Sequence, residues 1–133
     1  MAFNLDTYLG VDANALKLQS KRMEVIADNL ANSDTPGYKA RDIDFRAAMA
    51  QAGGADSPVA LATTNAGHIA TDPSSALDTS LKYRIPLAPS LDGNTVDAQQ
   101  EQAAFADNTV RYQATLSFLS GRIKSLLTAI TGQ

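Results

Sequence analysis

The stretch ADNLANSDTPGYK, residues 27–39, contains the signals that end one helix and redirect the chain. Asn32 is placed to terminate the helix, because asparagine tolerates the left-handed conformation that is common at helix ends. Thr35 precedes a proline, which pushes its backbone into an extended conformation. The four residues Thr35-Pro36-Gly37-Tyr38 fit a type II turn, with proline second and glycine where φ must be positive. The sequence therefore predicts that a long helix ends near residue 31 and that the chain then turns sharply.

Before this turn, residues 6–31 predict an amphipathic helix. Its apolar seam repeats every seven residues, a spacing typical of coiled coils, and consists of Leu9, Leu16, Met23 and Leu30. Val25 and Ile26 widen the stripe near its end. Charged residues off the seam, Arg22 among them, are expected on a solvated face.

The C-terminal part predicts a longer helix over residues 95–130. Its seam follows spacings of four and three without a break and consists of Phe105, Thr109, Tyr112, Leu116, Leu119, Ile123, Leu126 and Ile130. We expect Asn94 or Thr95 to cap its start, Asp97 to lie in its first turn and Gly132 to end it. A helix of about 36 residues is about 54 Å long, and a first helix of about 26 residues cannot cover its whole seam. Neighbouring molecules would bury the apolar surface that the first helix leaves uncovered. The alternative is a self-contained helical hairpin.

The middle of the chain, residues 32–93, is punctuated by glycine and proline and is rich in small polar residues, as irregular segments are. Within it, Asp44 is expected to cap a short helix that Gly53-Gly54 ends. Residues 81–85 alternate in polarity and predict a short strand.

Together these patterns predict a mainly α fold. Residues 1–31 and 94–133 would pair as a coiled-coil-like hairpin that forms a polymerisation core, joined by the irregular segment 32–93.

Composition narrows the function further. The 133 residues are 44% hydrophobic, enough to form a core, and the absence of cysteine excludes disulfides and cysteine-based zinc sites. A net charge of -3 with scattered basic residues argues against nucleic-acid binding. No run is long and apolar enough to insert into a membrane, and residues 1–10 lack the features of a cleaved secretory signal.

Chemistry-bearing residues are few. Asp42 and Asp44 form a tempting carboxylate pair, but we expect one to be a helix cap and the other a surface charge. His68 is the single histidine and is expected on the surface. Neither a phosphate-binding loop nor a nucleophile elbow occurs. We therefore expect no catalytic residue, no cofactor and no metal, and the chain is predicted not to be an enzyme.

The turn and its flanks resemble the rod, hook and hook-filament family of bacterial flagellar axial proteins. The family pattern Ala-Asn-x-x-Thr-x-Gly-Tyr is matched by residues 31–38, and the continuation through residue 45 narrows the resemblance to the B-type proximal rod proteins. Residues 93–97, 105–108 and 112–114 support it. Residues 98–100 depart from the bulkier, more charged helix start of that type, which leaves local contacts there open. The likeness covers roughly residues 10–50 and 90–131.

The resemblance implies a structural subunit of the hollow, torque-transmitting rod of the flagellar basal body, in the periplasm. Implied partners are other copies of the chain, other rod subunits, the rod-to-ring adapter with its membrane-ring base, and the flagellar type III export apparatus, which needs no cleaved signal peptide. The residues expected at subunit contacts are Leu9, Leu16, Met23, Leu30, Asn32, Thr35, Pro36, Gly37, Tyr38, Phe105, Tyr112, Leu116, Leu119, Ile123, Leu126 and Ile130.

Two other classes of function stay open. A soluble helical adaptor or export chaperone would also be small, acidic and helix-rich. A small hydrolase is disfavoured because the catalytic residues it needs are missing from the sequence.

Overall fold

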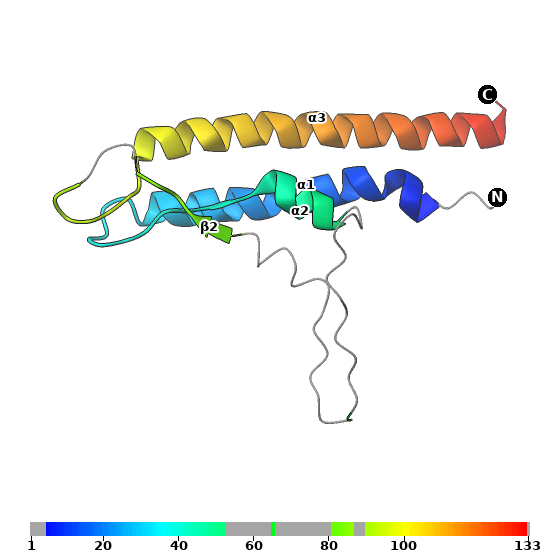
Figure 1. Ribbon diagram of the computed structural model, residues 1–133. Helices are drawn as coiled ribbons and strands as arrows, with labels where there is room; N and C mark the ends of the chain where they lie inside the picture. Colours follow the sequence, from blue (N-terminus) through cyan, green and yellow to red (C-terminus); the bar gives the residue numbers. More distant parts are fainter. Residues whose placement is uncertain (1–4, 53–64, 66–80, 87–89, 133) are drawn as a thin grey trace.

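Two long helices dominate the computed structural model, which describes residues 5–52, 65, 81–86 and 90–132. Helix α1 spans Leu5–Ala31 and helix α3 spans Ala98–Thr131. They lie side by side and antiparallel along the length of the molecule, so that the start of α1 and the end of α3 are at the same end (Figure 1). The predicted mainly α fold with paired terminal helices is confirmed.

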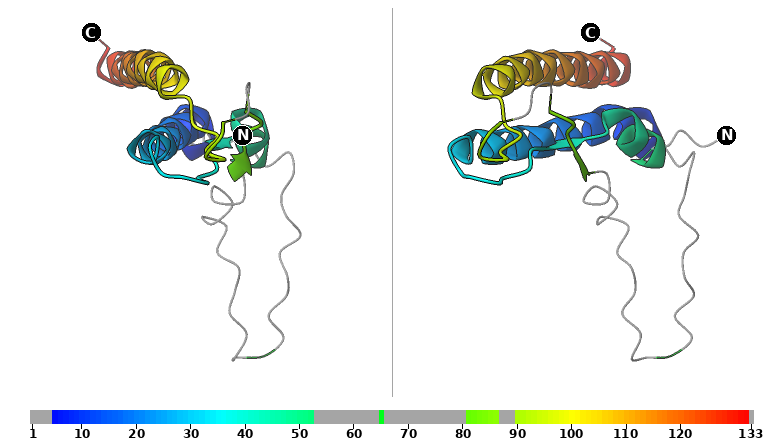
Figure 2. Two further views of the ribbon diagram at one scale, coloured as in Figure 1. Left: turned by 90° about the vertical axis from the view of Figure 1, so that its left-hand side faces the viewer. Right: turned by 60° about the vertical axis from the view of Figure 1, so that its left-hand side comes forward.

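A small second layer packs on α1. Helix α2 spans Phe45–Ala52, and strand β1 (Arg41–Ile43) pairs antiparallel with strand β2 (Leu81–Tyr83). Viewed along the long helices, α2 and α3 lie on different sides of α1 (Figure 2). The predicted strand exists but ends at Tyr83, and β1 was not predicted. The expected glycine stop of the short helix lies outside the described residues.

The turn after α1 has the predicted form. The Tyr38 N–H donates to the Thr35 carbonyl at 3.3 Å, and Gly37 has φ +72°, as a type II turn requires. The predicted left-handed Asn32 is wrong, because no described residue other than glycine has positive φ. Asn32 instead ends the helix with its side chain, whose Nδ2 donates to the Asp28 carbonyl at 2.8 Å.

The start of α3 differs from the prediction. Asp97, not Asn94 or Thr95, is the N-cap, and its side chain accepts from the backbone N–H groups of Gln99 and Gln100. The other two candidates are engaged elsewhere: Thr95 Oγ1 accepts from the Ala40 N–H, and the Asn94 amide binds the turn after α1. Gly132 ends the helix at φ +73° as expected, with its N–H bound to the Thr128 carbonyl.

The apolar core lies between α1, α2 and the small sheet. It consists of Leu18, Val25, Ile43 and Ala48, with Phe45, Met49 and Leu81 packed against it. Ile26 and Ala40 are also fully buried. Among the described residues of α3, only Glu101 and Asn108 are fully buried, and both are polar. The hairpin therefore has an apolar core on one side of α1 and a polar contact with α3 on the other.

Candidate subunit interface

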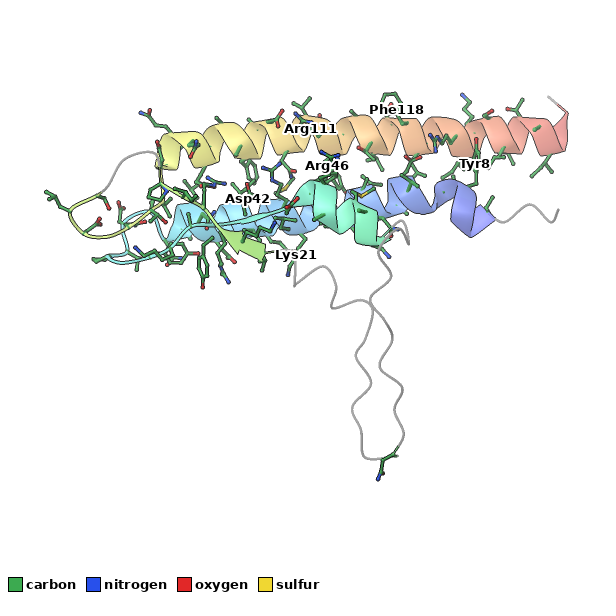
Figure 3. The ribbon with its side chains drawn as sticks, in the orientation of Figure 1. Tyr8, Lys21, Asp42, Arg46, Arg111 and Phe118 are labelled. Atoms are coloured by element: carbon green, nitrogen blue, oxygen red, sulfur yellow. The ribbon has the colours of Figure 1, made fainter. Side chains whose placement is uncertain are left out.

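Four polar residues of α3 spaced by seven make polar contacts with α1: Glu101, Asn108, Thr115 and Arg122. Their contacts are Asn29 Nδ2 to Glu101 Oε2 at 3.3 Å, Asn108 Nδ2 to the Gln19 carbonyl at 2.9 Å, Gln19 Nε2 to Thr115 Oγ1 at 3.2 Å, and Arg122 Nη1 to Asp12 Oδ2 at 2.9 Å. At the far end, where Figure 3 labels Tyr8, the Arg122 guanidinium also lies 5.7 Å above the ring centre of that tyrosine. A ladder of polar contacts thus runs along the α1–α3 contact.

The apolar seam of α3 lies beside this row of polar contacts, on a neighbouring face of the helix. Leu116 and Ile123 each follow a ladder residue by one position, which places them about 100° farther around the helix. Their exposed fractions are 46% and 50%, and that of Ile130 is 83%. The parallel row of Tyr112, Leu119 and Leu126 is half-buried. Part of the predicted seam therefore stays open to solvent.

The predicted seam of α1 lies on the same side. Leu9, Leu16, Met23 and Leu30 are half-buried, and Leu16 lines a shallow hollow together with Tyr112. Seven-residue spacing directs the four α1 side chains nearly alike. We call this combined surface the apolar face; its members are Leu9, Leu16, Met23, Leu30, Phe105, Tyr112, Leu116, Leu119, Ile123, Leu126 and Ile130.

The turn residues lie at the closed end of the hairpin, away from the apolar face. Thr35, Pro36 and Gly37 are exposed, whereas Asn32 and Tyr38 are half-buried. The segment before α3 fastens the turn in place. Contacts are Asn94 Nδ2 to the carbonyls of Asn32, Ser33 and Thr35 at 2.7–3.0 Å, the Gly37 N–H to Asp92 at 2.9 Å, and the Thr95 N–H to Tyr38 at 3.0 Å. The turn is therefore bound to the segment that precedes α3, and its exposed tip is accessible to other molecules.

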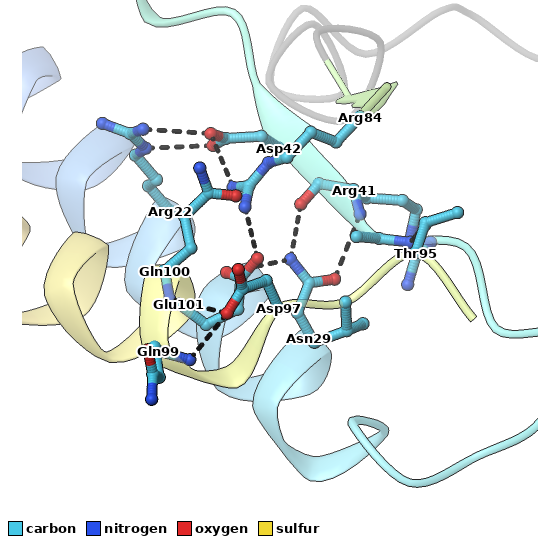
Figure 4. Close-up of polar contacts among 12 residues, drawn as sticks. Arg22, Asn29, Arg41, Asp42, Arg84, Thr95, Asp97, Gln99, Gln100 and Glu101 are labelled. Atoms are coloured by element: carbon cyan, nitrogen blue, oxygen red, sulfur yellow. Dashed lines mark hydrogen bonds and ion pairs between the residues drawn. The ribbon is translucent and has the colours of Figure 1, made fainter. Parts of the chain in front are cut away.

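A charged network near this end joins α1, β1, α3 and the segment that directly follows β2 (Figure 4). Arg22 of α1 binds both oxygens of Asp42 on β1 at 3.0 Å, and Arg84 binds Asp42 at 3.1 Å and also Glu101. Asn29, fully buried, donates to the Arg41 carbonyl at 2.7 Å and accepts from the Arg41 N–H at 3.1 Å. The network ties the sheet to both long helices.

The electrostatics of the network favour its charged form. Burial alone would raise the pKa of Asp42, but hydrogen bonds and charge from Arg22, with the charge of Arg84, outweigh it and hold the pKa below its ordinary value. The hydrogen bond to Asp42 raises the pKa of Arg22. Both predictions of solvated charge are therefore wrong: Arg22 and Asp42 side chains are each only 25% exposed, because each buries against the other.

Other predicted residues have structural roles. Asp44 caps α2 through the Ala47 N–H at 3.1 Å, as expected, and pairs with Lys82 at 2.7 Å. Lys82 and the Ala47 N–H lower the pKa of the Asp44 carboxyl. His68 lies outside the described residues. Across the part of the chain that the structure describes, no group of three or more His, Cys, Asp or Glu is arranged to hold a metal ion, and no helix has the length and apolar character of a membrane span.

The sequence is similar to those of known proteins over nearly its whole length. A family model described as flagella basal body rod protein matches residues 9–39, the second half of which is the α1 end and its turn. The flagellar basal body rod protein FlgB of Escherichia coli strain K12 is 46% identical over 98% of this chain and 97% of its own length. FlgB of Cereibacter sphaeroides strain ATCC 17029 is 50% identical over 94% of both chains, and that of Salmonella typhimurium strain LT2 is 41% identical over 99% of both. With identity this high over nearly the whole length, the chain belongs to the FlgB family of flagellar basal body rod proteins.

Proposed function

We propose that the chain is a structural subunit of the flagellar rod and that its apolar face is buried against neighbouring subunits. The observation that carries this proposal is the offset of the α3 seam from the α1–α3 contact, which leaves Leu116, Ile123 and Ile130 between 46% and 83% exposed. An open apolar stripe of this length on a small protein is typical of a surface that another molecule covers.

The shape of the molecule supports the same assignment. The apolar face runs along two helices of 27 and 34 residues, so one hairpin offers a long, straight docking edge. Contacts between two different surfaces of identical subunits, when the rotation does not close, generate helical assemblies. The charged network adds stiffness, because it fastens both helices and the sheet to each other.

The turn residues make a second, smaller part of the proposal. The exposed tip formed by Thr35 and Pro36 is presented rigidly, because Asn94 and Gly37 fix the chain on both sides of it. We propose that this tip contacts the adjoining rod subunit or adapter at the end of the hairpin.

The position in the cell rests on the family likeness. We propose a periplasmic rod location, assembly with other rod subunits and the rod-to-ring adapter, and passage through the flagellar type III export apparatus without a cleaved signal peptide. The relatives at 40–50% identity that are named as basal body rod proteins support the rod location.

Isolation of basal bodies tests the proposal directly. An epitope-tagged chain, placed at its own chromosomal locus, is expected in purified basal bodies and in the same fractions as the rod. Recovery in the cytosol alone, in cells that build complete flagella, would instead favour the adaptor or chaperone reading. Sedimentation of the purified chain should show association that increases with concentration, whereas a strictly monomeric chain would contradict burial of the apolar face by copies.

A further inference from the structure

The turn after α1 has few hydrogen bonds of its own. The Thr35 N–H donates to the Asn32 carbonyl at 3.1 Å. The Tyr38 N–H donates to the Thr35 carbonyl at 3.3 Å, which is longer than the usual range of about 2.7–3.2 Å. The tip formed by Thr35 and Pro36 is exposed, so water competes for these bonds. Local contacts alone therefore hold the tip weakly.

Asn94 supplies the missing contacts. It is only 6% exposed, and its Nδ2 donates to the carbonyls of Asn32, Ser33 and Thr35 at 3.0, 2.7 and 3.0 Å. Carbonyl oxygens that converge on one point repel each other unless a donor lies between them. The two hydrogens of one amide are shared among these oxygens. The shape of the turn thus depends on one side chain from a distant part of the sequence.

The same amide is tied to the start of α3. Its Oδ1 accepts from the Val96 N–H at 2.8 Å, and Val96 directly precedes Asp97, the N-cap of α3. In the next turn of the helix, Glu101 is fully buried and binds Arg84 and Asn29 (Figure 4). Because only two residues lie between the amide and the cap, a displacement of the start of α3 is passed on to the amide.

Two backbone hydrogen bonds close the same joint. The Gly37 N–H donates to the Asp92 carbonyl at 2.9 Å, and the Thr95 N–H donates to the Tyr38 carbonyl at 3.0 Å. They lie on either side of Asn94 in the sequence, so the turn and the segment that leads into α3 form one unit. The apolar core lies elsewhere, between α1, α2 and the small sheet, and contains no residue of this unit.

We propose that Asn94 makes the tip depend on α3: the turn keeps its type II shape only while the segment that leads into α3 is bound to it. Asn94 is thus a positioning residue that acts on the tip through the turn. In the rod, only a subunit whose α3 lies in place on α1 presents the tip to its neighbour. The inference rests on the proposed function, because the tip contact is part of it, and adds the condition under which that contact forms.

Hydrogen exchange of the purified whole chain in increasing urea tests this dependence. The reporter is the Tyr38 N–H, whose hydrogen bond lies within the turn and does not involve the segment before α3. We expect it to exchange through the same opening as the amides of α3, with the same urea dependence, because segments that open together form one cooperative unit. If it exchanges before α3 opens, or stays protected after α3 has opened, the inference is wrong.

Asn94→Asp is the sharpest variant. A carboxylate has the shape of the amide and still accepts from the Val96 N–H, but it cannot donate to the turn. The Tyr38 N–H should then exchange about 10- to 100-fold faster than in the wild type. It should also show little urea dependence, since a local opening exposes little surface. If Tyr38 and α3 accelerate together with unchanged urea dependence, Asn94 contributes stability alone and the inference is wrong.

Asn32→Asp is the matched control for hydrogen exchange, with the same change from amide to carboxylate in the same turn. Its lost hydrogen bond runs to the Asp28 carbonyl, which keeps the Asn32 N–H as a second donor at 3.2 Å. The Tyr38 N–H should therefore still exchange together with α3. A local opening in Asn32→Asp like that in Asn94→Asp would mean that any disturbance of the turn frees the tip, which would overturn the specific role of Asn94.

Recovery in basal bodies tests the consequence for assembly. In competition with the wild-type chain, Asn94→Asp and the tip variant Thr35→Arg should each be recovered less. The double variant should be recovered no less than the poorer single variant, because both changes act at one contact. Full recovery of Asn94→Asp, or losses that multiply in the double variant, would overturn the inference. Absence of the wild-type chain from basal bodies would instead remove the proposed function, on which the exchange results do not depend.

Discussion

Replacing Ile123 by aspartate separates the stability of one hairpin from the stability of the assembly. Ile123 is 50% exposed, so about half of the 1.5–3 kcal/mol that full burial supplies is already gained in the single chain. Ile123→Asp should therefore lower the free energy of unfolding by only about 1 kcal/mol, because the new carboxylate stays hydrated. In the assembly the same carboxylate would be buried without a partner, at a cost of roughly 3–5 kcal/mol, or about 10² to 4 × 10³-fold in association.

Thr128→Asp is the matched control. Thr128 is exposed and lies five residues farther along α3, about 140° around the helix from Ile123. Thermal unfolding by circular dichroism should place the midpoint of Ile123→Asp only about 3–5 °C below that of Thr128→Asp, as a loss of about 1 kcal/mol predicts. Ile123→Asp alone should lose association in sedimentation, lower the yield of basal bodies and reduce motility in soft agar. If both variants associate and assemble equally well, the apolar face is not covered in the rod and the reasoning from exposure is refuted.

Four further substitutions probe the network, the turn and the core. Glu101→Ala should lower the free energy of unfolding in urea by about 1.5–3 kcal/mol, since it removes one of the two carboxylates that bind Arg84 and leaves only Asp42; a loss below 1 kcal/mol would show that the network is solvated. Gly37→Val, at φ +72°, should cost about 1–2 kcal/mol in thermal unfolding, and an unchanged midpoint would contradict the turn geometry. The pKa of Asp42 is lowered in the fold, so its ion pairs stabilise the chain fully above the ordinary carboxyl pKa near 4, and this stability is lost as pH falls through the lower folded pKa. Urea unfolding measured from pH 6 to 2 should show this loss of stability. In Asp42→Asn this contribution to the pH dependence should be absent. Ile26→Ala, at a fully buried position, should cost about 2–5 kcal/mol by urea unfolding, and tolerance would mean that Ile26 is not core.

Helices and turns could be predicted from the sequence where neighbouring residues alone determine the backbone conformation. Proline and glycine at residues 36 and 37 leave few conformations for the turn, and the four-and-three spacing of apolar residues specifies a helix through residue 130. The start of α3 was misplaced by three residues for a tertiary reason. Asn94 has the chemistry of a cap, but its amide is held by three carbonyls of a turn about 60 residues earlier in sequence.

The polar contact between the helices could not be found by the rule that polar residues face water. Glu101 and Asn108 lie on the face of α3 that meets α1 because each has a specific partner there, and partners on another helix are invisible to periodicity. One signal was present: Glu101, Asn108, Thr115 and Arg122 repeat every seven residues, parallel to the apolar seam. A polar heptad row beside an apolar one indicates that two surfaces of the helix have separate partners. The residues proposed for subunit contacts remain predictions, although the exposure of Ile123 and Ile130 is what such contacts need.

A polar ladder inside the hairpin and an apolar face outside it have different consequences for alignment. Sliding α3 by one heptad would put Asn108 where Glu101 now meets Arg84, and would move Arg122 from Asp12 to the uncharged Gln19. Each shifted register thus strands a buried or half-buried charge, which costs several kcal/mol, whereas a wholly apolar seam would lose much less. The ladder therefore selects one alignment of the two helices before any neighbour arrives. Since the apolar rows of α1 and α3 keep their positions relative to that alignment, every copy presents the same apolar face, and repetition of one contact between two different surfaces of successive copies is what generates a regular helical assembly.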